Sequence, residues 1–249
     1  MKIVNKSVIE YQVVRSRRKT LSLQVRHGQV IVRAPYCIDE KFICTFIDKK
    51  SAWLKAKIAQ QSQAKDFCCD FSEGSTLFLF GQLVILRIIF AKQVRTELAD
   101  DDINNQQVLT IVLAERNKNK LHNRVLLAAA VKKQIEKYFK QQAENIILPK
   151  VITYSQLTSL TPTSIKIRQY RARWGSCNNR GELSFNYLLM MLPIDVINYV
   201  VIHELCHLQH LNHSKAFWQL VAKFFPDYIQ AKQWIKINQS ALLWRLPSY

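Results

Sequence analysis

The sequence predicts an α+β protein in which a small amino-terminal strand-rich module, residues 1–115, precedes a more helical second domain, residues 116–249. Two observations support this prediction. Short runs that alternate apolar and polar residues dominate the first part, whereas a long helical pattern without Gly or Pro starts near residue 118. We find no internal repeat. A chain of 249 residues is long enough for two modest domains that each bury a core.

The first module is expected to contain short strands and one helix. Ala34-Pro35 ends the third strand, and a helix is predicted from Asp39 to Lys65. Gly81-Gln82 separates two apolar runs and predicts a strand hairpin. The expected strands lie at about 3–13, 21–25, 29–33, 76–80, 83–90 and 108–114.

The second domain is expected to open with a helix over about 118–143, rich in Lys, Gln, Leu and Ala. Residues 164–188 alternate apolar and polar side chains around the turn sequence CNNRG, which predicts an antiparallel hairpin. Pro193 and Asp195 then provide a helix start.

Three of the six histidines lie in HELCHLQHLNH, residues 203–213. His203 and His207 are one helical turn apart, so their rings can converge on one metal ion. Glu204 falls on the apolar side of the same helix, which also includes Leu205, Leu208 and Leu211, and a carboxylate there is costly unless it has a polar partner or a function. The HExxH spacing on an amphipathic helix is typical of a zinc site. The sequence therefore predicts a metal site on this helix.

The chain resembles the YgjP-like metallopeptidase domain family, a relative of the SprT-like proteases. The resemblance rests on HELCHLQHLNHSKAFW, on RARWGSCNNRGELSFNYLL before it and on FPDYIQAKQW after it. VRSRRKTLSLQVRHGQVIVRAP also matches the family's amino-terminal pattern, so the resemblance covers about residues 8–240.

This resemblance implies a zincin-like, zinc-dependent metallopeptidase (a hydrolase) that acts on proteins or peptides. It implies one Zn²⁺ per chain, with His203, His207 and His213 as metal ligands and Glu204 as the catalytic acid/base. Three neutral imidazoles leave the ion its full charge, which lowers the pKa of a metal-bound water toward about 7. Glu204 would take the proton of that water and return it to the leaving amine.

The pattern departs from that of the metzincins, which share the histidine spacing. His210 stands where HExxHxxGxxH has glycine, and all three methionines precede His213, so the downstream Met-turn of metzincins is ruled out. We interpret His210 as a turn or supporting residue and not a fourth ligand, because four ligands would close a catalytic site. His210 or Asn212 is expected to adopt the left-handed conformation.

Two alternative functions remain open on the sequence. Residues 116–249 carry 19 basic against 6 acidic side chains. This charge would suit a SprT-like protease acting on DNA-bound proteins, or a non-catalytic, zinc-stabilised module that binds nucleic acid. Tyr170 and Trp174 could stack on unpaired bases. The basic residues expected to contact nucleic acid are Lys166, Arg168, Arg171, Arg173 and Arg180.

Three further expectations concern the remaining residues. The amino terminus has no signal-like apolar run and no stretch is long enough to span a membrane, so we expect a cytoplasmic protein without a membrane partner. The six cysteines show no metal or disulfide spacing and are expected to be reduced thiols. Ser176 and Cys177 lack an evident acid-base partner, so we interpret Trp174–Cys177 as a strand end beneath the site.

Overall fold

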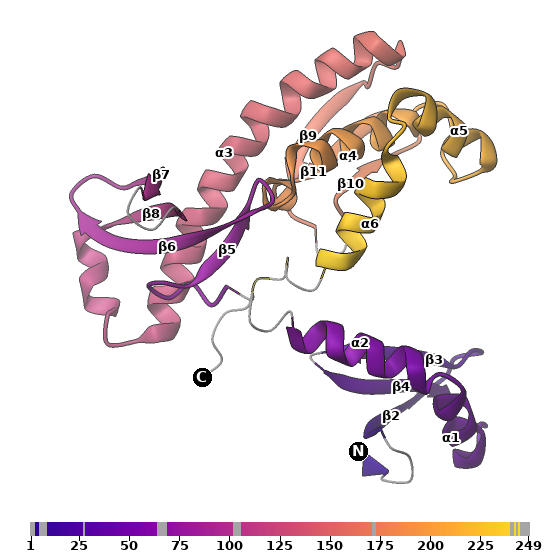
Figure 1. Ribbon diagram of the computed structural model, residues 1–249. Helices are drawn as coiled ribbons and strands as arrows, with labels where there is room; N and C mark the ends of the chain where they lie inside the picture. The colour runs from indigo at the N-terminus through magenta and orange to yellow at the C-terminus, as the bar shows by residue number, and fades with distance from the viewer. Residues whose placement is uncertain are drawn as a thin grey trace. The chain divides into compact units, whose positions relative to one another are not determined.

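The computed structural model divides the chain into two compact units, Met1–Phe67 and Cys68–Tyr249, which are described separately (Figure 1). It describes residues 3–4, 9–26, 28–63, 69–101, 106–170, 173–239, 242 and 244. The class is α+β, as the sequence predicts.

The first unit is a four-stranded sheet with two helices. Its strands are β1 (Ile3–Val4), β2 (Tyr11–Ser16), β3 (Ser22–Arg26) and β4 (Gln29–Pro35), in the order β1-β2-β4-β3 with β2 and β4 parallel. The single helix expected over 39–65 is two helices, α1 (Glu40–Lys49) and α2 (Ser51–Gln63), which meet at Lys50. Val32, Ile43, Ile47 and Leu54 form the centre of a core that belongs to this unit alone.

The second unit begins with another four-stranded sheet. Its strands are β5 (Thr76–Leu79), β6 (Gln82–Ala91), β7 (Arg95–Asp101) and β8 (Gln106–Ala114), in the order β5-β6-β8-β7. The hairpin predicted around Gly81-Gln82 is confirmed by the antiparallel pairing of β5 with β6. β6 and β8 are parallel, and β7 runs antiparallel to β8.

This sheet belongs to the histidine-bearing unit, so the division of the chain lies at Phe67 and not at residue 115 as expected. The reason is packing. The tip of the β5–β6 hairpin donates backbone hydrogen bonds from Phe80 and Gly81 to the carbonyls of Met190 and Met191, at 2.7 and 3.2 Å. Leu86 and Ile111 share one core with residues of the later helices. The change from an alternating pattern to a helical pattern near residue 115 marks the end of a sheet and not the end of a domain.

A 3-10 turn, η2 (Glu115–Lys120), leads into the long helix α3 (Arg124–Thr158). This helix continues well past the end expected near residue 143 and passes through Pro149. Its buried face explains the length, because inward-facing residues recur every three or four positions on both sides of the proline. They are Ala128, Val131, Ile135, Phe139, Ala143, Ile147 and Val151.

A second, three-stranded sheet follows α3. It contains β9 (Ser164–Arg168), β10 (Gly175–Cys177) and β11 (Glu182–Asn186), in the order β10-β11-β9. β10 and β11 form the antiparallel hairpin expected around CNNRG, but β9 pairs with β11 in parallel. The expectation of one antiparallel hairpin over 164–188 is therefore wrong for β9, which needs a crossover and not a turn to reach its partner.

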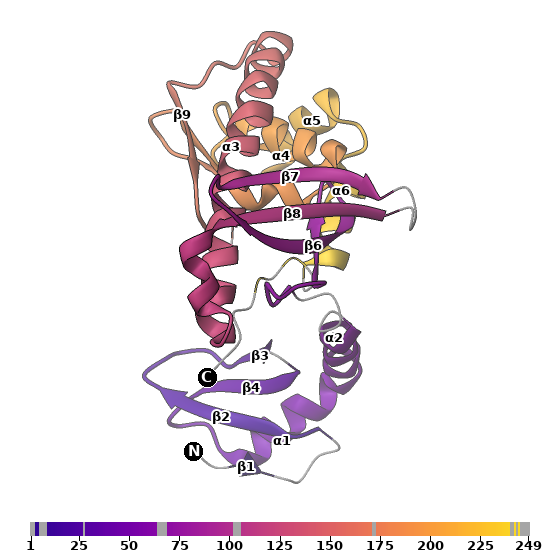
Figure 2. The same cartoon turned by 90° about the vertical axis from the view of Figure 1, so that its left-hand side faces the viewer.

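The chain then enters the 3-10 turn η3 (Tyr187–Met191) and three helices, α4 (Ile194–Cys206), α5 (Lys215–Phe224) and α6 (Tyr228–Asn238). α4 contacts α3, β10, α5 and α6, so it lies at the centre of the second unit. Figure 2 shows β6, β7 and β8, which belong to the four-stranded sheet of this unit, in front of α3 and α4. None of the helices in the described ranges combines the length and the apolar composition that a membrane span needs.

Candidate metal centre

The carboxyl-terminal end of α4 carries the first two histidines. Ile197, Val201 and Leu205 are fully buried on this helix, so the last turn is held against the core. His203 lies in that turn, and His207 is the residue at which the helix ends. Leu211, which the helical pattern places on the same apolar face, is 63% exposed because the helix has already ended before it.

The segment after α4 brings the third histidine back to the first two. His213 precedes Ser214, whose side chain caps α5 by accepting a hydrogen bond from the backbone of Phe217. His203, His207 and His213 each offer a ligand atom, and these atoms lie within 4.8 Å of one another. His210 is not part of this group.

The spacing of these nitrogens suits a single metal ion. Nε2 of His203 and Nε2 of His213 are 3.1 Å apart. A tetrahedral zinc with bonds of about 2.0–2.1 Å to nitrogen would place two ligands about 3.3 Å apart. Three imidazoles match the donor type that zinc prefers, so the residues fit the ion that the sequence predicts.

Two of the rings have a partner at Nδ1, which leaves Nε2 as the nitrogen that can face a metal. Nδ1 of His207 lies 2.9 Å from the carbonyl oxygen of His210, to which it can donate its proton. This leaves Nε2 of His207 with a free electron pair. Nδ1 of His203 lies 3.3 Å from the hydroxyl of Tyr199, and its Nε2 is the nitrogen that faces His213.

Those contacts also bear on two expectations about the turn. His210 supports His207 through its carbonyl oxygen, in agreement with its interpretation as a supporting residue. Neither His210 nor Asn212 has a positive φ, so the expected left-handed residue is absent from this described turn.

Aromatic side chains from α5 and α6 hold the imidazoles in place. The ring of Phe217 stacks on His207, with centroids 4.5 Å apart, and the ring of Trp218 stacks on His213 at 5.4 Å. The ring of Tyr228 stacks in turn on Trp218 at 5.4 Å, and the ammonium of Lys232 lies 3.8 Å from the centroid of Trp218. Such packing limits the rotamers available to the imidazoles.

The histidines closest to the core are kept neutral by their surroundings. Burial lowers the pKa of His203 to about 3, and the charges of His207, His213 and Lys232 act in the same direction. Burial also lowers the pKa of His207, although its hydrogen bond to His210 opposes this change. A neutral imidazole is the form that binds a metal ion.

Glu204 lies beside this group and is only 6% exposed. Burial raises the pKa of its carboxyl to about 8, and the charge of Arg173 opposes that rise. Strand β10 passes directly against it, because a Cβ atom built on Gly175 would lie 2.6 Å from both Cγ and Oε1 of Glu204. Only glycine leaves room for the carboxylate at this point.

Residues of β10 do not form a second reactive centre. Burial raises the pKa of the Cys177 thiol to about 11, and the charge of Glu204 raises it further. Ser176 shares a hydrogen bond of 2.9 Å with the hydroxyl of Tyr170. β10 contacts α4, which agrees with the interpretation of Trp174–Cys177 as a strand end beneath the site. Cys37, Cys44, Cys69, Cys177 and Cys206 are free thiols, and Cys68 lies outside the described residues.

Asn186 is a supporting residue that the sequence reasoning missed. Its buried amide donates hydrogen bonds to the carbonyls of Tyr170 and Arg173, at 3.1 and 2.9 Å. Its backbone N–H donates to the carbonyl of Trp174 at 2.8 Å. These bonds tie the segment before β10 to β11 and so position Gly175 against Glu204. The only sign of this supporting role in the sequence was an asparagine at the end of an apolar strand.

Most of the residues expected to bind nucleic acid interact with other groups of the protein. A hydrogen bond from Asn178 holds the pKa of Glu182 below the usual value, and the charges of Lys166, Arg180 and Arg168 act in the same direction. Trp174 packs against the core of the unit, and Tyr170 is bonded to Ser176. Arg173 acts on Glu204, and Arg171 lies outside the described residues. The ring of Trp174 and the hydroxyl of Tyr170 thus already have partners within the protein.

Comparison with known proteins gives the family of this chain. No curated protein matches the sequence. Among solved structures, the crystal structure of the metallopeptidase zymogen of Pyrococcus abyssi abylysin matches 41% of this chain and 99% of its own, with 21% identity and a TM-score of 0.34. The model of the YgjP-like metallopeptidase domain family matches residues 19–238. Because that match spans most of the sequence, the chain belongs to the YgjP-like metallopeptidase domain family.

Proposed function

We propose that this chain is a zinc-dependent peptidase that hydrolyses peptide bonds in proteins or peptides, with one Zn²⁺ per chain bound by His203, His207 and His213. The metallopeptidase family supports the reaction class. The observation that carries the proposal is the convergence of three imidazole nitrogens next to a buried glutamate. A structural zinc site has no need of such a carboxylate, so Glu204 argues against a module whose zinc is only structural.

Glu204 is the residue that moves the proton in this proposal. A zinc ion bound at the site would supply a Lewis acid that polarises the scissile carbonyl and makes water more acidic. The carboxylate of Glu204 would take a proton from water and return it to the leaving amine, and its burial, which raises its pKa above the ordinary value, makes it a stronger base than an exposed glutamate. Arg173 favours its charged form, and Gly175 leaves the space in which it sits.

An extended substrate can be accommodated along β10. This strand is at the edge of its sheet, paired only with β11 among the described strands, and its first residue touches Glu204. A peptide that adds to this edge would form main-chain hydrogen bonds close to the proton-transferring carboxylate. We therefore place the substrate backbone along Gly175–Cys177.

Metal content and hydrolysis measured on the same variants test the proposal. His203→Ala and His213→Ala are expected to lose zinc, because each removes a ligand. Glu204→Gln is expected to keep one zinc per chain and to lose hydrolysis of a protein substrate by about a hundredfold or more, because it removes proton transfer alone.

His122→Ala is the matched control, since His122 is exposed and far along the chain from the site. It should keep both zinc and activity. A His213→Ala protein that binds one zinc as tightly as the wild type would show that the third ligand is misassigned, and an active Glu204→Gln protein would remove the proposed acid/base.

A further inference from the structure

A second concave site lies in the same unit, between η2 and α3. It is a pocket of about 640 Å³ lined by the end of β8, by η2 and by the amino-terminal half of α3. Pockets that bind small molecules are commonly about 300–1,000 Å³ in volume. None of its lining residues belongs to the proposed metal centre.

The pocket is strongly basic. Five of its twelve lining residues are Lys or Arg and one, Glu136, is acidic. The charge of Glu136 is already matched, because its carboxylate accepts hydrogen bonds from Lys132 and from the hydroxyl of Tyr187. It therefore does not neutralise the cations around it.

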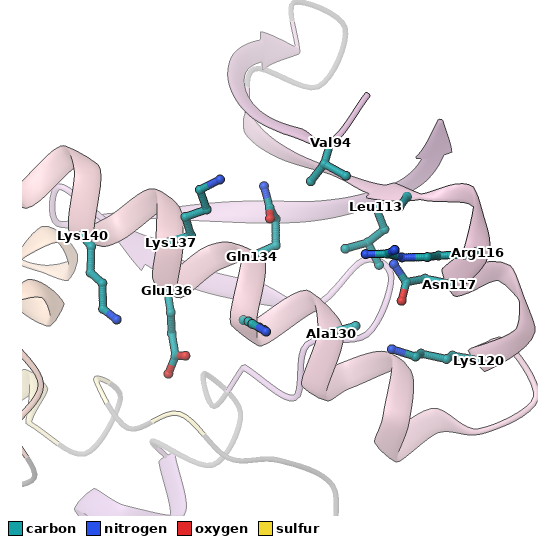
Figure 3. A pocket seen from close by; sticks show the side chains of 12 residues that line it. Val94, Leu113, Arg116, Asn117, Lys120, Ala130, Gln134, Glu136, Lys137 and Lys140 are labelled. Carbon is teal, nitrogen blue, oxygen red and sulfur yellow. The ribbon is translucent and has the colours of Figure 1, made fainter. Parts of the chain in front are cut away.

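None of the five cations has an acidic partner within the described residues. Lys140 is engaged elsewhere, with its ammonium 5.4 Å from the centroid of the Tyr187 ring. Arg116, Lys120, Lys133 and Lys137 form no ion pair within the described part of the chain. Figure 3 shows Arg116 and Lys120 extending from η2 toward α3, so the cations that line the pocket come from two elements and are not merely spaced along one helix.

Like charges held on two sides of a hollow repel one another, and a bound anion reduces this repulsion. Walls of low dielectric concentrate the field of such a cleft and attract anionic ligands. Arginine can bind a phosphate through two parallel hydrogen bonds, and lysines add point charges. Several separate cations match a ligand with several anionic groups better than they match a single phosphate.

The rest of the lining fits the organic part of such a ligand. Val94, Leu113 and Ala130 form an apolar portion of the wall. Gln134 donates a hydrogen bond to Thr96 at 3.2 Å through its amide nitrogen, which leaves its side-chain oxygen available as an acceptor. Asn117 offers a second side-chain amide. Apolar contacts with a few polar groups are typical of sites for small organic ligands.

We propose that the pocket between η2 and α3 binds a small organic polyphosphate of the nucleoside triphosphate type, with Arg116, Lys120, Lys133 and Lys137 around its phosphates. This binding is separate from the proposed peptidase site. The size of the hollow favours a small ligand over a phosphodiester chain, which needs a groove that continues along the surface.

Calorimetry of the full chain with ATP, inorganic triphosphate and adenosine tests the proposal. ATP and triphosphate should bind, adenosine should not, and affinity should fall as salt is added because the phosphates are screened. Lys133→Glu combined with Lys137→Glu should weaken ATP binding by about tenfold or more, since each change replaces an attraction to the phosphates by a repulsion. The milder pair Lys133→Gln and Lys137→Gln should give an intermediate loss.

Lys150→Glu combined with Lys223→Glu is the matched control, because it makes the same change of charge outside the pocket. It should bind ATP almost as the wild type does. Zinc content should be unchanged in all these variants, which separates this test from that of the peptidase. The proposal is wrong if ATP does not bind at low salt, if both double reversals weaken binding equally, or if only a single-stranded oligonucleotide binds and loses affinity in the Lys133/Lys137 variant.

Discussion

Gly175 is the residue at which the backbone of β10 and the carboxylate of Glu204 come closest. Its φ lies outside the left-handed region, so a side chain there is opposed by lack of space and not by backbone strain. A methyl group would have to displace Cγ and Oε1 of Glu204, both 2.6 Å from the position of a Cβ atom. The need for glycine thus comes from the position of the carboxylate to which we assign proton transfer.

Gly175→Ala is therefore expected to reduce kcat with zinc content unchanged. A displacement of about 1 Å at a reacting group can cost about a hundredfold in rate. Gly74→Ala is the control, because Gly74 has a φ of 74° but no atoms within 4 Å of the position that a Cβ atom would occupy. It should lower stability by about 1 kcal/mol and leave kcat unchanged. A Gly175→Ala protein with full activity would mean that Glu204 does not need its present position.

At the scale of the elements, the sequence predicts those parts of the site that depend on local pattern. The spacing of His203, Glu204 and His207 depends only on helical periodicity, and the β5–β6 hairpin depends on the turn at Gly81. The direction of β9 could not be predicted, because alternation indicates a strand but does not identify its partner.

The length of α3 was underestimated for a different reason. Proline inside a helix costs about 3 kcal/mol, and local preference therefore favours an earlier end. Pro149 is exposed, however, whereas Ile147 and Val151 on either side of it are buried. Burial of two such side chains contributes about 1.5–3 kcal/mol each, enough to offset the proline. This balance depends on tertiary packing, which the sequence pattern alone does not contain.

The edge position of β10 leads to a prediction about specificity. Main-chain pairing recognises the substrate backbone and gives little discrimination between side chains. A cleavage-site profile on a mixed peptide library should therefore be broad. N-methylation of a substrate amide next to the scissile bond should lower kcat/KM, whereas exchanging the adjacent side chains should change it little. A strict preference for one residue at the scissile bond would instead indicate a deep side-chain pocket.

At the scale of the whole molecule, the same sheet topology occurs twice. The orders β1-β2-β4-β3 and β5-β6-β8-β7 both have an antiparallel first pair, a parallel central pair and an antiparallel last pair. The sequence shows no repeat, because this topology requires only apolar alternation and suitable turns. The two sheets differ in what they pack against. The first has its own core with α1 and α2, whereas the second shares the core of α3 and α4.

These separate cores predict how fragments of the chain will behave. A fragment of residues 68–249 should unfold cooperatively and bind one zinc, because its core contains no residue from the first unit. A fragment of residues 116–249 retains all three histidines but loses the sheet. The buried aliphatic side chains that it loses are Leu77, Leu79, Val84, Leu86, Leu109 and Ile111.

Each of those side chains contributes about 1.5–3 kcal/mol when fully buried. Their combined contribution is comparable with the whole net stability of a domain, which is about 5–15 kcal/mol. The shorter fragment also loses the hydrogen bonds from the β5–β6 tip to Met190 and Met191, directly before α4. We therefore expect it to lack a cooperative thermal transition and to bind zinc weakly, as measured by calorimetry and metal analysis against residues 68–249. A cooperative 116–249 fragment with one tightly bound zinc would show that the histidine helix is supported without the sheet, and would return the domain boundary to residue 115.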